Sequence, residues 1–585
     1  MRESTWDLSV FYQGFDDPAL RQDIEELPHL LEKGHRLLSQ ENEPSAKLAA
    51  LIEVLEQVAN RLSKTFGYCQ LTLSTDAENP TAFRYLDELT TLSVDVEILQ
   101  SAFARYVGTV TDLPAMICGH EVLEKNAFIL EEYAELCAHM LPPSLEKWML
   151  RMSLSGGDAF SKLRDQLMGT HTVTLDDKTL PLPAVRGMAY DPDVQVRKRA
   201  YEAEIASYAK VALPMAFCLA GIKGEALTLC EAKGYPDILT QQLAESRMDA
   251  QTLSAMLAAI KESLPDFRRY LRAKAKKLGH TGGLPFYDLF APVSRESKTY
   301  TIQEAESLLI TTLGSVHPEM GEFIRHAFQN RWIDVYPRDG KEGGAFCSGN
   351  HELKISRILT NFVGSFSDIS TLAHELGHAW HDRCLTAAPV LMSNPPMPLA
   401  ETASIFNETL LNHTIRQTAD SDLTFTLLEN SLMEATQTVV DIYGRYLFES
   451  AVFDARKTHT PTVDELNALM RDAQAKSYGD GLDAELRHPY MWVNKSHYYM
   501  VGLHFYNFPY AFGLLFGLGV FAKYKEEGAS FMAQYDTLLA RCGSGKVADV
   551  AASVGIDVHS VDYWRSAMDM IRQEIDEFVA LCERV

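Results

Sequence analysis

The sequence is poor in cysteine, and its cysteines are not arranged in pairs. Nine cysteines are scattered over 585 residues without a Cys-x-x-Cys pair. This usage argues against a thiolate zinc cluster and a disulfide framework, and it favours a reducing compartment. The first residues reach charge at once and contain no apolar core of about 7 to 15 residues, so no secretory signal is predicted. We therefore expect a cytoplasmic protein.

Positive charge is also scarce. The chain has 54 Lys and Arg against 79 Asp and Glu, which gives a formal net charge of −25. No local basic stripe offsets this balance, so we expect no nucleic-acid partner. Residues 498–522 carry no charge and are long enough to span a bilayer, but His504, Asn507 and Pro509 would each need an internal partner in lipid. A buried core segment is predicted there, and no membrane partner. The sequence does not indicate an oligomeric state.

Strict alternation of apolar and polar residues is rare, and helical periodicity is common. One apolar stripe falls at positions i, i+3, i+7 and i+10 and consists of Leu89, Leu92, Val96 and Leu99. No repeat of fixed period is present, which argues against a helical solenoid. Because 46% of the residues are hydrophobic, the chain can bury a large core. The sequence therefore predicts a mainly α-helical fold.

Two short segments predict β-structure. Residues 172–182 alternate around Asp176-Asp177 as a small hairpin would, and residues 354–362 read as one strand after a glycine-rich loop. Prolines follow the hairpin and predict a boundary, which divides the chain into an N-terminal helical part, 1–190, and a second part, 191–585.

One motif carries chemistry. The pattern His374-Glu375-x-x-His378 places two imidazoles on one face of a helix, where both can bind a single Zn²⁺. Glu375 lies beside them and is suited to take a proton from metal-bound water. The helix is expected to begin near Ser367 or Asp368, either of which can cap it.

A catalytic zinc site needs a third protein ligand and one open position. His381 shares the face of His374 and is one candidate. Glu401 and Glu408 are better candidates, because they follow a proline-rich loop at the start of a new helix and share a face at a spacing of seven. One of the two is suited to be a zinc ligand, and the other is suited to orient an imidazole that binds the zinc. A solvated helix face is the alternative for Glu408.

Three other readings of the chain are weaker. A Walker A loop at Gly543-Ser544-Gly545-Lys546 fails, because residue 540 is Ala and residue 547 is Val. A metal-binding protein without catalysis is disfavoured by the intact Glu375. A secreted protease of the thermolysin type is disfavoured by the missing signal sequence and the free cysteines.

With these motifs the sequence resembles a known family, the zinc oligopeptidases that include thimet oligopeptidase and oligoendopeptidase F. The resemblance is strongest to the oligoendopeptidase F branch. The similarity extends over essentially the whole chain. It is carried by residues 6–9, the Gly-Ala-Phe-Cys-Ser-Gly loop at 344–349, the motif at 374–381, the segment at 401–408, the aromatic run at 505–513 and the segment at 541–546.

The resemblance implies a zinc-dependent endopeptidase that hydrolyses short unstructured peptides by attack of a metal-bound water. It implies one zinc per chain and a helical fold with a deep channel between N- and C-terminal parts. A small β element beside the motif helix would hold the peptide backbone, through residues 355–362, under a mobile glycine-rich cover. The implied roles are zinc ligation by His374, His378 and Glu401, general-base catalysis by Glu375, and stabilisation of the tetrahedral intermediate by His497, Tyr506 and Tyr510. His504 is the alternative to His497.

Overall fold

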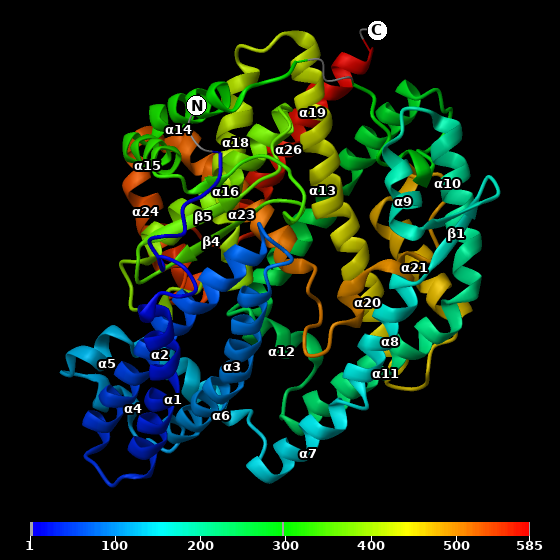
Figure 1. Ribbon diagram of the computed structural model, residues 1–585. Coiled ribbons are helices and arrows are strands. Elements are labelled where there is room, and N and C mark those ends of the chain that lie inside the picture. The colour runs from blue at the N-terminus through cyan, green and yellow to red at the C-terminus, as the bar shows by residue number, and fades with distance from the viewer. Residues whose placement is uncertain (1–3, 295–297, 584–585) are drawn as a thin grey trace. The chain divides into compact units, whose positions relative to one another are not determined.

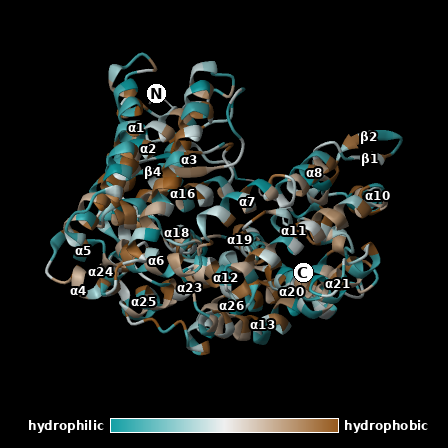
Figure 2. Ribbon diagram, turned by 90° about the horizontal axis from the view of Figure 1, so that it is seen from below, coloured by the Kyte–Doolittle hydropathy of each residue, from teal (hydrophilic) through white to brown (hydrophobic). Residues whose placement is uncertain are grey.

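Helices make up most of this computed structural model, which describes residues 4–294 and 298–583 (Figure 1). The mainly α-helical prediction is confirmed. The helices of Figure 2 carry hydrophilic and hydrophobic residues in turn along their length, as amphipathic elements do. The sequence signals at helix starts are local, as where Asp17 and Asn79 accept backbone hydrogen bonds in front of a proline in the first turn.

The chain forms two compact units, and each is made of three chain segments. Unit 1 contains residues 1–140, 297–415 and 520–556, and unit 2 contains residues 141–296, 416–519 and 557–585. The division into an N-terminal helical part, 1–190, and a catalytic part, 191–585, stays a prediction. As a boundary between compact units it does not hold, because residue 190 lies inside unit 2.

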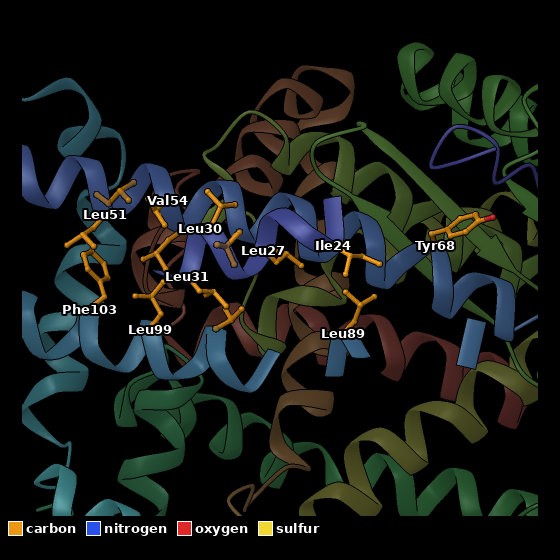
Figure 3. Packing of buried hydrophobic residues seen from close by; sticks show 14 of the residues in the cluster. Ile24, Leu27, Leu30, Leu31, Leu51, Val54, Tyr68, Leu89, Leu99 and Phe103 are labelled. Atoms are coloured by element: carbon orange, nitrogen blue, oxygen red, sulfur yellow. The ribbon is translucent and has the colours of Figure 1, made fainter. Parts of the chain in front are cut away.

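Unit 1 begins with a helical bundle and continues into the elements around the motif. Its helices are α1 (Pro18–Ser39), α2 (Pro44–Leu73), α3 (Pro80–Val107), α4 (Leu113–Ile117), α5 (Glu121–Lys125), α6 (Ala127–Ala138), α14 (Ile302–Val316), α15 (Pro318–Gln329), α16 (Phe366–Leu385), η4 (Val390–Met392), α17 (Met397–Ala400), α18 (Thr402–Arg416), η8 (Gly528–Phe531), α24 (Met532–Arg541) and α25 (Val547–Ala552). The core of the bundle is shown in Figure 3, where Leu27, Leu31 and Leu99 lie between α1, α2 and α3. Leu99 belongs to the stripe predicted from the sequence.

A three-stranded sheet completes unit 1. Its order is β3 (Ile333–Asp334), β5 (Ile355–Leu359), β4 (Phe346–Asn350), with β5 parallel to β3 and antiparallel to β4. The strand predicted at 354–362 is therefore present as β5. The expected pairing of this segment with a peptide backbone is not favoured, because β4 lies along one edge of β5 and β3 pairs with Ile358 and Leu359 on the other. The outer edge of β4 pairs with no other strand in the described part of the chain.

Unit 2 is helical apart from one hairpin. Its elements are α7 (Pro143–Ser153), α8 (Gly157–Gly169), β1 (Thr172–Leu175), β2 (Lys178–Pro181), α9 (Leu182–Gly187), η1 (Met188–Tyr190), α10 (Val194–Ser207), η2 (Tyr208–Lys210), α11 (Ala212–Ala232), α12 (Ile238–Glu245), α13 (Ala250–Lys277), η3 (Phe286–Asp288), α19 (Ser421–Ala435), the π-helix η5 (Thr436–Asp441), α20 (Ile442–Arg456), α21 (Val463–Ser477), η6 (Gly479–Gly481), α22 (Met491–Asn494), η7 (Ser496–Tyr499) and α26 (Val561–Glu583). The helix α23 (Phe508–Glu527) crosses the division between the units. The predicted hairpin is confirmed, and Asp176 and Asp177 make its turn at positive φ.

The uncharged segment 498–522 is core, as predicted. Its residues Tyr498, Phe512 and Phe516 are at most 1% exposed, and the segment is broken by a loop between η7 and α23. Among the described residues one helix, α11, is long and apolar enough to cross a membrane by length and composition. It carries Lys223, which is fully buried in an ion pair with Glu449 at 2.5 Å.

Candidate active site

The motif helix α16 begins at Phe366, about two turns before His374. Ser365 caps it and shares a capping box with Asp368: the Ser365 hydroxyl accepts from the Asp368 amide, and the Asp368 carboxylate accepts from the Ser365 amide. The predicted cap at Ser367 or Asp368 is therefore wrong by two to three residues. Asp368 also accepts from the amides of Val363 and Gly364, so the chain enters the helix at a fixed angle.

The far half of α16 is held by a carboxylate from α24. The Trp380 indole donates to Asp536 Oδ1 at 3.1 Å, and Asp536 Oδ2 lies 2.8 Å from Nε2 of His317. The Trp380 ring is 2% exposed. The motif helix is therefore held at its start by the capping box and in its far half by Asp536.

Three potential metal ligands converge on one point. Glu401 Oε2 lies 3.3 Å from His374 Nε2 and 3.2 Å from His378 Nε2, and the two Nε2 atoms are 3.2 Å apart. For a tetrahedral ion with bonds of about 2.0 to 2.1 Å, the ligand atoms lie about 3.3 Å from one another. The donor set therefore fits zinc. The side chains of His374, His378 and Glu401 are 24% to 32% exposed to solvent, so one side of the group is open to water or substrate.

Electrostatics favour a cation at the same point. Burial opposes the charged forms, but the hydrogen bonds between the imidazoles and the carboxylate outweigh it. The pKa of Glu401 is held well below its usual range by His374 and His378, and the pKa of His374 is raised well above its own by Glu401 and Glu408. Both shifts mean that positive charge between these groups is stabilised.

Glu401 lies in a break between two helices, where its backbone ends α17 and precedes α18. Its Oε2 accepts a hydrogen bond from Ser404 Oγ at 2.7 Å, which orients the carboxylate. Gly377 of α16 allows the approach of α18: a Cβ there would lie 2.6 Å from the Ala403 carbonyl oxygen and 2.6 Å from the Ser404 Cα. The glycine in the middle of the motif therefore sets the distance between the imidazoles and Glu401.

Glu408 is placed to orient the imidazole ring of His374. Its Oε2 lies 3.5 Å from His374 Nδ1, on the other side of the ring from Glu401, and its Oε1 accepts from Ser370 Oγ at 2.9 Å. The alternative that Glu408 belongs to a solvated face does not hold, because its carboxylate contacts these two side chains. A carboxylate at Nδ1 fixes the tautomer that leaves Nε2 free to bind a metal.

Glu375 and His381 occupy different surroundings on the same helix. Glu375 is 6% exposed, and burial raises the pKa of its carboxyl group. His381 is 2% exposed and is not part of the group of converging ligand atoms. Burial lowers the pKa of His381 to about 4, which keeps the imidazole neutral inside the unit. Its position therefore indicates a structural role.

The predicted oxyanion residues lie in unit 2 and form one aromatic group. The His497 ring centroid is 4.9 Å from that of Tyr506 and 6.1 Å from that of Tyr510, and the two tyrosine rings are 5.3 Å apart. The pKa of His497 is lowered by burial and by the neighbouring Arg445 guanidinium. Asn507 follows Tyr506 and accepts from Arg445 Nη1 at 3.3 Å, a support that the sequence did not reveal.

His504 is placed apart from this group. It is 5% exposed, its Nδ1 lies 3.2 Å from the buried Lys223 ammonium, and its backbone amide donates to Gln242 Oε1. This surrounding lowers the pKa of His504 well below its usual value, chiefly through burial. Of the two histidines left open by the sequence, only His497 packs against the predicted tyrosines.

The glycine-rich loop before β4 is tied to its surroundings. Gly340 O accepts from the Ala77 amide, and the Glu342 amide donates to Ser74 O at 2.8 Å at the end of α2. The Asn361 side chain donates to the carbonyls of Glu342 and Gly344. These bonds do not favour the mobile cover expected from the sequence.

An H-E-x-x-H helix with a carboxylate as third ligand, supplied just before a later helix, defines a metallopeptidase centre. The sequence profile of peptidase family M3 matches residues 187–570, which is more than half of the chain. The chain therefore belongs to peptidase family M3 and is a metalloendopeptidase. Membership of this family implies a metal ion, and zinc is typical of it.

Relatives and solved structures agree over nearly the full length. An oligoendopeptidase F homologue of Lactococcus lactis is 23% identical over 618 residues, which cover 99% of this chain and 97% of the relative. The oligopeptidase PepF of Bacillus subtilis is 22% identical over 595 residues, which cover all of this chain and 88% of the relative. The crystal structure of oligoendopeptidase F from Enterococcus faecium has a similar fold, with a TM-score of 0.72 and 18% identity. The match covers 97% of this chain and 99% of that one.

Proposed function

We propose that this protein is an oligoendopeptidase that cuts short, unstructured peptides at internal bonds with one zinc ion per chain. The observation that carries the proposal is the convergence of His374, His378 and Glu401 at spacings of 3.2 to 3.3 Å beside the buried Glu375. The names of the oligopeptidase relatives support the substrate class.

His374, His378 and Glu401 would hold the ion, and Glu408 orients the His374 ring through Nδ1. Zinc bound there supplies a Lewis acid that polarises the scissile carbonyl and makes water a better nucleophile. Glu375 accepts a proton from the attacking water and delivers it to the amine nitrogen as the C–N bond breaks, so protons balance over the cycle. Its raised pKa suits both steps.

His497, Tyr506 and Tyr510 are proposed as hydrogen-bond donors to the oxyanion of the tetrahedral intermediate. The packing of their rings on one another supports a common task. The lowered pKa of His497 keeps the imidazole neutral near pH 7, so that one ring nitrogen donates without a charge to desolvate.

Substrate binding is proposed to use the free edge of β4. A strand edge offers backbone donors and acceptors that hold an extended peptide without reading its side chains. Because β5 is occupied on both sides, β4 replaces the segment expected from the sequence. The nine free cysteines support a reducing cytoplasmic location. The absence of nucleic-acid and membrane partners stays a prediction.

The function is tested by metal analysis and peptide cleavage on the same preparation. We expect one zinc per chain, loss of activity with a chelator and recovery with zinc, and cleavage of a peptide mixture at internal bonds as read by mass. Full activity after verified metal removal would contradict the proposal.

The oxyanion assignment is tested separately. His497→Ala, Tyr506→Phe and Tyr510→Phe should each lower kcat by about 10²-fold, with little change in KM, because such donors act mainly in the transition state. His504→Ala is the matched comparison from the same segment. If His504→Ala loses kcat with unchanged folding while His497→Ala does not, the two roles are reversed.

A further inference from the structure

A cavity lies inside unit 1, beside the far half of the motif helix. Its volume is about 420 Å³, which is within the usual range of small-molecule sites. The wall is formed by α2, by the end of β4 and the start of β5, by the last two turns of α16, and by the segment that leads from α16 toward α17. Figure 2 shows α2, β4 and α16 close together. The metal ligands His374, His378 and Glu401 are not among the lining residues, so the cavity is separate from the metal centre.

Asp382 of α16 brings a carboxylate to the wall of this cavity. Its Oδ2 accepts from Ser356 Oγ at 3.0 Å, and the Cys347 thiol lies 3.8 Å away. Gly349 makes room for the carboxylate, because a Cβ at that position would overlap with Oδ2. Its Oδ1 accepts no hydrogen bond, and the carboxylate forms no ion pair, with any residue that the structure describes. A carboxylate that is partly desolvated and lacks a counter-ion is unfavourable, and an ammonium entering the cavity removes this cost.

Lys354 supplies a positive charge to the same wall. It lies in the turn between β4 and β5 with a φ of +54°, a left-handed conformation that is uncommon for a residue other than glycine. The turn is fixed by Asn350, whose side-chain Oδ1 accepts from the Leu353 amide at 2.9 Å. The Lys354 ammonium forms no ion pair or hydrogen bond within the described part of the chain. Residues held in such a conformation are concentrated at ligand-binding and active sites.

The remaining charged or titratable side chains of the wall are already engaged. The Arg383 guanidinium lies 5.7 Å from the ring centroid of Phe323 and 4.7 Å from that of Trp380, and it is 3.9 Å from Glu319 Oε2. His351 Nε2 lies 2.9 Å from a backbone carbonyl oxygen of the segment after α16. These groups therefore have partners in the protein, unlike Asp382 and Lys354.

An apolar face completes the cavity. The rings of Trp332 and Phe323 pack edge to face with their centroids 5.5 Å apart, and Leu385 and Val390 add aliphatic surface. Such a surface gains free energy when it covers an apolar side chain of a ligand. The wall thus combines one free carboxylate and one free ammonium with an apolar face.

We propose that this cavity binds a free dipeptide, with its ammonium at Asp382 Oδ1, its carboxylate at Lys354 and its apolar side chains against Trp332 and Phe323. A ligand that matches both charges must be a zwitterion, and short peptides with free ends are zwitterions that peptide hydrolysis releases. The binding site is argued from its own residues. That its ligand is a product of the enzyme rests on the proposed function and deepens it.

The first test is calorimetric titration of the zinc-loaded wild-type enzyme with three probes. The probes are leucyl-leucine, its N-acetyl form, which lacks the ammonium, and its C-terminal amide, which lacks the carboxylate. Each blocked form should bind about 10- to 100-fold more weakly than leucyl-leucine, because it loses one charge-assisted contact. Equal affinity for the three probes, or no binding of leucyl-leucine, would overturn the inference.

Variants place the ligand in the cavity. Asp382→Asn should remove the preference for a free ammonium and keep the preference for a free carboxylate. Lys354→Gly should do the reverse, and Lys354→Arg should restore the carboxylate preference because it keeps the charge. Because glycine adopts positive φ readily, Lys354→Gly should keep or raise Tm while the preference is lost, which separates lost binding from misfolding. Lys125→Met is the control, since it removes an exposed lysine of unit 1, and it should bind as the wild type does.

The outcomes separate the site from the proposed function. Wild-type affinity for leucyl-leucine in folded Asp382→Asn and Lys354→Gly would place the dipeptide elsewhere, for example at the metal, and would refute the site. If Asp382→Asn does not fold, Lys354→Gly alone decides. Binding with the expected preferences by an enzyme that cuts no peptide would contradict the proposed function and leave the site standing. Peptide cleavage without this binding would contradict the site alone.

Discussion

Replacing Gly377 by alanine tests whether close helix packing builds the metal site. In an exposed helix the change would stabilise the protein by about 0.5 to 1 kcal/mol, because glycine is a poor helix former. Here the new Cβ would lie 2.6 Å from the Ala403 carbonyl oxygen and the Ser404 Cα, while ordinary contacts begin at 3.4 Å. Relief therefore requires a separation of about 0.8 Å, and overpacking of this kind typically costs about 1 to 3 kcal/mol.

The same shift moves a ligand. Glu401 lies two residues before Ala403, and its Oε2 is 3.2 to 3.3 Å from both imidazole nitrogens. Metal–ligand distances tolerate only about 0.2 Å. A displacement of about 0.8 Å should therefore weaken zinc binding by at least about 10- to 100-fold, the range seen when supporting residues of metal sites are lost.

The assay is a zinc titration against a competing chelator, with thermal unfolding of the metal-free protein on the same samples. Gly169→Ala is the matched control, because this helical glycine at the end of α8 has nothing within 4 Å of an added Cβ. The control should keep its zinc affinity and gain stability slightly, as expected for alanine in an uncrowded helix. Wild-type zinc affinity in Gly377→Ala, together with a raised Tm, would show that α18 adapts and that the glycine does not set the ligand spacing.

Four further predictions concern the centre and its substrates. Glu375→Gln should keep zinc and lose nearly all turnover, since the amide cannot accept a proton; substantial kcat with bound zinc would remove its role. Glu408→Ala should weaken zinc binding by about 10- to 100-fold, and Glu401→Ala should weaken it more. If metal analysis gives the reverse order, Glu408 is the zinc ligand and Glu401 the residue that orients the imidazole. Peptides with one cleavable sequence should be cut when short and spared when that sequence lies in an exposed loop of a folded domain; equal rates would refute size selection. With a net charge of −25, cationic peptides should have a higher kcat/KM at low salt, an advantage that fades as the Debye length falls to about 8 Å.

The motif helix could be predicted from the sequence because it depends on residues that are close together in the chain. His374 and His378 share a face through helical geometry alone, and the hairpin turn at Asp176-Asp177 depends only on neighbouring residues. The start of the helix was predicted two to three residues too late, since Ser365, Ser367 and Asp368 are all competent caps and only the local backbone decides among them.

The third ligand could be narrowed to three residues from the sequence, but no further. Spacing left His381, Glu401 and Glu408 as candidates, and choosing among them requires the crossing of α16 and α18 at Gly377. The resemblance favoured Glu401, and the structure places Glu401 with the imidazoles. Local spacing gives no signal for a contact between distant segments, so Asp536, which lies 156 residues from Trp380, could not be found.

The two units were also beyond sequence reasoning. Prolines after the hairpin signalled a boundary near residue 190, but each unit is built from three separated segments of chain. Composition reports where a chain turns, and it does not report which distant helices pack together. The free edge of the sheet escaped for the same reason, because the strand order β3-β5-β4 is a property of long-range pairing.

The bond between Trp380 and Asp536 has a consequence for how the enzyme is made. A ribosome adds about 5 to 20 residues per second, so the motif helix leaves the ribosome roughly 8 to 30 seconds before the carboxylate that anchors it. During this interval the nascent chain carries both histidines and Glu401 without the contact that fixes their helix. The motif helix thus gains this anchor only when more than nine-tenths of the chain has been synthesised, so the last tenth of the chain decides when the helix is fixed.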